Sequence, residues 1–240
     1  MNKLLFLDLE TTGLEEKDRI CELALIVQEE DNMICSSSLC KSSKKISTQA
    51  MSLHHITNEM IKEAPGCEQS QAYRWLADNN QKENVLITHN MDLHLSMLAK
   101  EGFVSKMSHV DTQRCTKALI NECEHFALQF LRYELLLYRD EGKLSEELGV
   151  SMSAHRALSD ACHVKLLYHT LLEYATLSQL VEISSKPILM QKLPFGKYSG
   201  RYIEEIVDLD RSYIQWMLEG IKDMDEDLKY SISYYTQGET

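Results

Sequence analysis

Residues 6–14 read Phe-Leu-Asp-Leu-Glu-Thr-Thr-Gly-Leu, and this stretch constrains the fold more than any other. Its first half is typical of a buried β-strand, in which successive side chains point to opposite faces of a sheet. Asp8 and Glu10 therefore share one face at the end of the strand. Two neighbouring carboxylates repel each other unless a cation neutralises them, and their oxygens suit Mg²⁺ or Mn²⁺. The stretch predicts a metal site, and a solvated edge strand is the alternative.

The composition is that of a globular protein with a core of its own. The 240 residues are 44% hydrophobic and 26% charged, which allows one medium domain and a small one. No apolar run is long enough to span a bilayer, so we expect a cytoplasmic protein with no membrane partner. The seven cysteines include no Cys-x-x-Cys pair, which favours reduced thiols. The net charge of -12 does not exclude a nucleic-acid partner, because binding depends on local patches.

Strand and helix patterns alternate along the first part of the chain. Apolar or alternating runs predict further strands at 20–27, 33–39, 85–87 and 110–112. Helical spacing predicts helices at 58–63, 69–77, 91–101, 116–138, 145–149 and 154–172, the fourth of them as one helix or two. A meander followed by alternating strands and helices indicates an α/β domain with a mixed five-stranded sheet flanked by helices.

The composition changes near Ser184, where Ser-Ser-Lys-Pro resembles a linker. We expect one domain over 1–180, a linker over 181–190 and a small α+β module over 191–240. Cations alternate with aromatic side chains from 192 to 202. This run predicts a grip on a nucleic-acid backbone, through Lys197, Tyr198 and Arg201, or a small hairpin whose rings form a minor core.

Further polar residues lie at the ends of predicted elements. Asn90 follows the strand at 85–87, His155 lies at the junction where the 154–172 helix opens, and Asp160 lies one turn into that helix. In this order, after Asp8-x-Glu10, they resemble the motifs of the DEDDh 3′-to-5′ exonucleases over about residues 3–173. Phe-Gly-Lys-Tyr-Ser-Gly at 195–200 and Tyr-Ile-Gln-Trp at 213–216 are similar to the C-terminal module of the exodeoxyribonuclease X group.

The resemblance implies an RNase H-like fold that hydrolyses phosphodiester bonds at 3′ ends and releases nucleoside monophosphates. Two divalent cations, Mg²⁺ or Mn²⁺, would straddle the scissile phosphate about 4 Å apart. The family pattern makes Asp8, Glu10 and Asp160 their ligands. His155 would be the general base, because the unperturbed pKa of histidine is near the operating pH. The residues implied in nucleic-acid contact are Thr11, Leu14, His54 and Asn90, with Leu14 as a wedge against the terminal base.

The implied partner is the 3′ end of DNA, single-stranded or frayed from a duplex, in repair or proofreading. No motif separates DNA from RNA, so trimming of RNA 3′ ends stays open as an alternative. A catalytically weakened subunit that binds ends or associates with a polymerase is the second alternative.

The chain departs from the family pattern at His94, where the pattern has an acid four residues after Asn90. Asp92 is not a substitute, because residues 90 and 94 share a helix face and residue 92 points nearly opposite. Imidazole weakens a Mg²⁺ site but is an acceptable ligand for Mn²⁺. We therefore expect His94 to be a metal ligand in an enzyme that prefers Mn²⁺, or else the mark of weakened activity.

Overall fold

The computed structural model describes residues 2–153 and 155–237. Its sheet has the strand order β3-β2-β1-β4-β5. β1 (Leu4–Thr11) is central, and β2 (Ile20–Glu29) and β3 (Asn32–Leu39) follow it as an antiparallel meander. β4 (Val85–Thr88) and β5 (Ser108–Asp111) run parallel to β1 on its other side. The mixed five-stranded sheet predicted from the sequence is confirmed.

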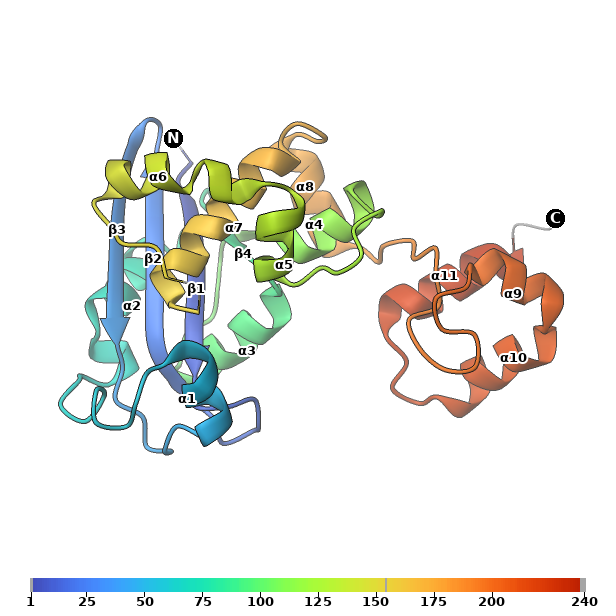
Figure 1. The fold of residues 1–240 in the computed structure, drawn as a ribbon, viewed down its shortest axis with the longest axis horizontal. Helices are drawn as coiled ribbons and strands as arrows, with labels where there is room; N and C mark the ends of the chain where they lie inside the picture. Colours follow the sequence, from blue (N-terminus) through green and yellow to red (C-terminus); the bar gives the residue numbers. More distant parts are fainter. Residues whose placement is uncertain (1, 154, 238–240) are drawn as a thin grey trace.

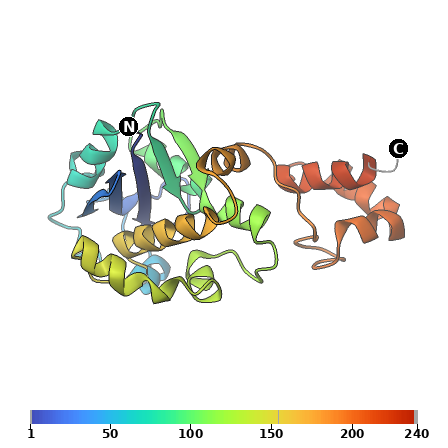
Figure 2. The ribbon, with the colours of Figure 1, turned by 90° about the horizontal axis from the view of Figure 1, so that it is seen from above.

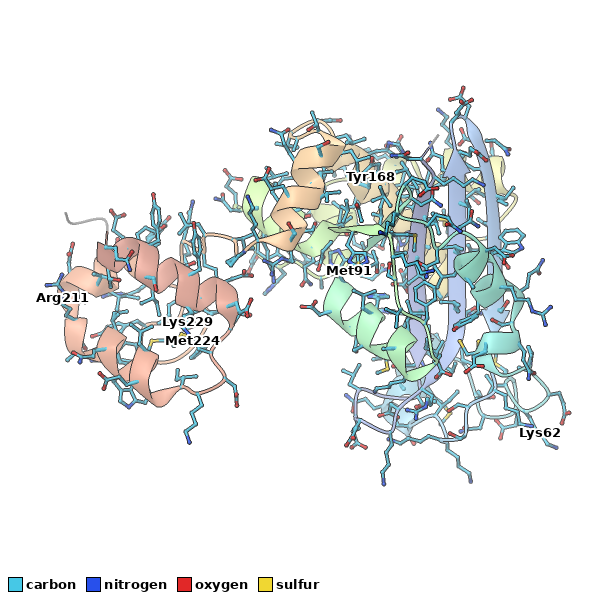
Figure 3. The ribbon with its side chains drawn as sticks, turned by 180° about the vertical axis from the view of Figure 1, so that it is seen from behind. Lys62, Met91, Tyr168, Arg211, Met224 and Lys229 are labelled. Carbon is cyan, nitrogen blue, oxygen red and sulfur yellow. The ribbon has the colours of Figure 1, made fainter. Side chains whose placement is uncertain are left out.

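The two faces of β1 bury different side chains, and helices cover both faces of the sheet (Figure 2). Leu5, Leu7 and Leu9 belong to the core formed with α2 (Gln71–Asp78) and α3 (Met91–Lys100). Phe6 faces α7 (Ala157–Leu171), and its ring packs edge-on against Tyr168 with centroids 5.5 Å apart. Because side chains alternate along a strand, Asp8 and Glu10 also lie on the α7 side.

Shorter helices complete the α7 side and the loop end of the sheet (Figure 1). Buried side chains join the α7 core from α4 (Thr112–Leu119), α5 (Leu128–Glu134), η2 (Leu137–Arg139), α6 (Glu141–Leu148) and α8 (Leu177–Ser185). The other face also receives η1 (Cys67–Gln69), and α1 (Thr48–His54) lies below the end of β1 in the view of Figure 1. No helix in the described residues is long and apolar enough to cross a membrane.

Three local predictions from the sequence differ from the structure. Residues 58–63 form turns, and the helix lies earlier, at α1, where Ser47 caps it by accepting a hydrogen bond from the Ala50 N–H at 3.1 Å. The predicted 116–138 helix is split into α4, α5 and η2, because Cys123 in the intervening loop also turns into the core. The first half of the predicted 181–190 linker belongs to α8, which packs on the α7 core through its fully buried Leu180.

The C-terminal module builds a small core of its own. α9 (Ile203–Leu209), α10 (Arg211–Gly220) and α11 (Glu226–Gln237) enclose it, and Figure 1 shows them joined to the rest by an extended segment. Arg114 of α4 ties the two parts, since its guanidinium donates hydrogen bonds to both carboxylate oxygens of Asp227 at 2.8 and 2.9 Å. We propose that the module begins after Ser185, because α8 still packs on the sheet.

Candidate active site

Three carboxylates from two elements converge at the end of β1. Asp8 and Glu10 belong to β1, and Asp160 lies in the first turn of α7, which packs across that face. Their ligand oxygens all lie within 4.8 Å of one another. Asp8 and Asp160 are buried and Glu10 is half-buried. The arrangement has the hard oxygen donors and the unbalanced negative charge that a divalent cation requires, so these residues fit a metal site.

Burial within the cluster raises the pKa values of two of these acids. Burial, together with the charges of Asp8, Asp160 and Glu22, raises the pKa of Glu10 to about 9. Burial raises the pKa of Asp8 to about 6, against the opposing hydrogen bond with His94. Raised pKa values mean that the ionised carboxylates are disfavoured at these positions unless positive charge is nearby. A bound cation would supply that charge.

His94 reaches the cluster because β4 is short. β4 pairs with β1 only from Leu4 to Phe6, so the first turn of α3 fills the space beside Asp8. His94 is buried, with Nε2 3.1 Å from Asp8 Oδ1. Burial alone would lower the pKa of His94, but the hydrogen bond and charge of Asp8 raise it above its ordinary value.

The tautomer of His94 follows from its second contact. Nδ1 lies 2.8 Å from the Asn90 carbonyl, which can only accept, so Nδ1 carries a hydrogen. In the neutral ring Nε2 then presents a lone pair towards Asp8. Two electron pairs facing each other at this distance need a positive charge to share, either a proton or a cation. The facing atoms of Asp8 and His94 thus have room for either a shared proton or a cation.

Asp111 anchors α3 and was missed as a site residue by sequence reasoning. Its carboxylate accepts hydrogen bonds from the Asn90 and Met91 N–H groups at the start of α3, at 3.2 and 2.9 Å. It also caps α4 by accepting from Gln113 at 2.8 Å and from Arg114. One buried carboxylate thus fixes two helix starts, and with them the position of His94. Its only signal in the sequence is an acid at the end of a predicted strand.

His155 lies at the junction before α7, where it is exposed and adopts a left-handed conformation with φ of 57°. The next residue, Arg156, donates two hydrogen bonds to the buried carboxylate of Glu22, at 3.0 and 2.7 Å. The Ala157 N–H donates to the same carboxylate at 3.2 Å. Glu22 pairs opposite Glu10 across β1 and β2. The start of α7 is therefore fixed to the sheet. Glu22 is an acid inside an otherwise apolar strand, and this was the sequence feature that could have indicated its role.

The residues predicted to contact nucleic acid occupy different environments. Leu14 is 75% exposed and Asn90 is exposed in a left-handed conformation. The Thr11 hydroxyl donates to the Gly13 carbonyl at 2.8 Å. His54 is 2% exposed, where its Nδ1 accepts from the Ile56 N–H at 3.0 Å and its Nε2 lies 3.2 Å from the Thr11 carbonyl. His54 therefore contacts the backbone of Thr11 from a buried position.

The basic and aromatic run lies in a hairpin of the module, where Lys192 and Tyr202 pair antiparallel. Lys197 is 3.1 Å from Asp210, and the Tyr198 hydroxyl donates to the same carboxylate at 2.9 Å. Arg201 is exposed. The structure thus contains a hairpin at this run, but its rings do not form a core of their own, because Phe195 and Tyr202 are exposed. Part of its positive charge is paired inside the module.

Comparison with known proteins agrees with this architecture. The exonuclease family model matches residues 5–168, and the model of exodeoxyribonuclease X-like C-terminal regions matches residues 193–222. Exodeoxyribonuclease 10 of Escherichia coli strain K12 is 23% identical, covering 98% of this chain and 99% of its own. An uncharacterized exonuclease of Escherichia phage 186 is 28% identical over 68% of this chain and 84% of its own.

Solved structures share the fold. Exonuclease X in complex with 5′ overhanging duplex DNA superimposes with a TM-score of 0.55 at 19% identity, over 77% of this chain and 99% of that one. Exonuclease I of Escherichia coli with a dT13 oligonucleotide gives a TM-score of 0.54 at 18% identity, over 76% of this chain and 43% of that one. The family model spans the sheet and the whole carboxylate site, and the chain belongs to the exonuclease family.

Proposed function

We propose that this protein is a DNA exonuclease that removes nucleoside monophosphates from 3′ ends. The observation that carries the proposal is the convergence of Asp8, Glu10 and Asp160, within 4.8 Å, inside an exonuclease fold. Similarity to proteins named for deoxyribonuclease activity, and to a structure with bound DNA, favours DNA over RNA.

The carboxylates and His94 are the groups proposed to hold the metal. Asp8, Glu10 and Asp160 would share one divalent cation, and Asp8 with His94 would hold a second. When bound, divalent cations activate the attacking water and neutralise charge on the phosphate and the leaving 3′ oxygen. Because His94 offers nitrogen where the family pattern has an acid, we propose that the preferred ion is Mn²⁺ and not Mg²⁺.

The remaining residues have proposed roles in proton transfer and substrate binding. His155, exposed at the start of α7, would accept the proton of the attacking water. Leu14 would stack on the terminal base, while Thr11 and Asn90 would hold its sugar and phosphate. His54 would act through Thr11. Arg201 and Lys197 would contact the phosphate backbone further along the DNA strand, with Tyr198 beside them. To do so, Lys197 would leave its ion pair with Asp210 and bind a phosphate instead.

Digestion of matched DNA and RNA oligonucleotides tests the proposal. Each is single-stranded, has the same sequence and carries a label at its 5′ end. We expect a ladder that shortens one nucleotide at a time on DNA with Mn²⁺, and slower shortening of RNA. A circular DNA, which has no 3′ end, is the control and should stay intact. Early release of the 5′ label as a mononucleotide would show digestion from the 5′ end and contradict the proposed polarity. Faster digestion of RNA than of DNA would show that RNA is the preferred substrate.

A further inference from the structure

Asp160 belongs to a closed ring of polar side chains, in which Asp160, Glu141 and His163 are buried and Gln129 and Arg132 are half-buried. Gln129 of α5 donates an amide hydrogen bond to Asp160 Oδ1. His163 of α7 is fully buried, with Nδ1 3.2 Å from the same oxygen and Nε2 3.2 Å from Glu141 Oε1 of α6. Arg132 of α5 binds both oxygens of Glu141, at 2.5 and 2.7 Å. It also donates to Gln129 Oε1 at 3.3 Å, which closes the ring.

Hydrogen bonds around Gln129 and Arg132 fix the orientation of their neighbours in the ring. The Gln129 amide has its oxygen towards Arg132 and its nitrogen towards Asp160, so the polarity of both neighbours sets its orientation. Arg132 grips Glu141 with a planar fork, which constrains direction as well as distance. That contact holds the pKa of Glu141 below its ordinary value, so Glu141 stays charged. The Asp160 carboxylate is therefore oriented by two members of the ring, Gln129 and His163.

We propose that Arg132 and Glu141 are positioning residues that act through Gln129 and His163 to hold the Asp160 carboxylate ready for the cation. The inference rests on the proposed function, because it takes Asp160 to be a metal ligand. Partners that orient a ligating side chain commonly change metal affinity by about 10- to 100-fold when they are lost. The ring also gives α5 and α6, which lie outside the sheet, a role in the site.

Mn²⁺ binding to the full-length protein, measured by calorimetry without substrate, tests the proposal. We expect Glu141→Gln, which keeps the side chain's size but removes its charge, to raise the Mn²⁺ dissociation constant about tenfold. Arg132→Met should raise it by a similar factor. Arg132→Lys keeps the charge but loses the planar fork, so its dissociation constant should lie between those of the unaltered protein and Arg132→Met. The matched control is Arg139→Met, an exposed arginine on the adjoining η2, which should bind Mn²⁺ like the unaltered protein.

A double variant distinguishes the proposed positioning role from a general loss of stability, because it shows whether the effects of the two substitutions on Mn²⁺ affinity are coupled. If Arg132 and Glu141 act along one path, the double variant should bind Mn²⁺ no more weakly than the weaker single variant. Excess Mn²⁺ should restore kcat in each variant and leave KM for the oligonucleotide unchanged. Mn²⁺ affinity unchanged in Glu141→Gln and Arg132→Lys, or lost equally in Arg139→Met, would overturn the inference. Binding and digestion by the unaltered protein test the proposed function separately in the same experiment.

Discussion

Asp8→Asn should lower kcat on single-stranded DNA by about a thousandfold or more, a loss of about 4 kcal/mol of transition-state stabilisation. The ligand oxygens of Asp8, Glu10 and Asp160 lie within 4.8 Å of one another, and Asp8 Oδ1 is also 3.1 Å from His94 Nε2. The amide keeps the shape of the side chain but cannot replace its charge. Initial rates with Mn²⁺, measured on a 5′-labelled oligonucleotide, give the ratio.

The same variant should keep or gain stability in the metal-free state, and this distinguishes a lost ligand from a lost fold. Burial raises the pKa of Asp8 to about 6, so its ionised form costs stability at neutral pH when no cation is present. Replacing it by the neutral amide removes that cost. Asp92→Asn, at an exposed acid of α3, is the matched control and should change neither kcat nor the melting temperature. A lower melting temperature in Asp8→Asn, or retained activity, would remove Asp8 from the proposed metal site.

His94→Asp should raise the rate with Mg²⁺ about tenfold and abolish the preference for Mn²⁺. The substitution restores an oxygen donor beside Asp8, where the imidazole now offers nitrogen. It also adds another carboxylate to a buried acidic cluster, so the metal-free variant should melt at a lower temperature than the unaltered protein. Saturating Mg²⁺ should recover that loss, because a bound cation stabilises the folded state. Rates and melting temperatures measured across Mg²⁺ and Mn²⁺ concentrations give both results.

The control for His94→Asp is the same substitution at His125, which is exposed and belongs to a loop. His125→Asp should alter neither metal preference nor rate. Equal or better turnover of the unaltered protein with Mg²⁺ would contradict the proposed Mn²⁺ preference. A ladder from His94→Asp but none from the unaltered protein would support the alternative of an end-binding subunit.

The central strand could be predicted because its pattern is local. Alternation alone places Leu5, Leu7 and Leu9 on one face and Phe6 with Asp8 on the other, and the structure confirms both. The order of the motifs then predicted that Asp160 would join them, and it does. His94 was identified as the departure from the family pattern, and the structure brings it to Asp8.

What the sequence could not supply were contacts between residues far apart in the chain. Asp111 caps α3 from another strand, and Glu22 binds the start of α7 more than 130 residues away. His163 is buried between Asp160 and Glu141, and this position depends on how α5 and α6 fold over α7. Helix ends were misplaced for the same reason, since buried Leu180 extends α8 into the predicted linker. These features depend on tertiary packing and not on local pattern.

The most direct test of the metal site is anomalous diffraction from crystals grown with Mn²⁺. We predict a peak about 2.2 Å from oxygens of Asp8, Glu10 and Asp160, and a second beside Asp8 and His94 Nε2. The same crystals of Asp8→Asn should lose both peaks while the fold is retained. Strong Mn²⁺ peaks elsewhere, with none among the three carboxylates, would contradict the account.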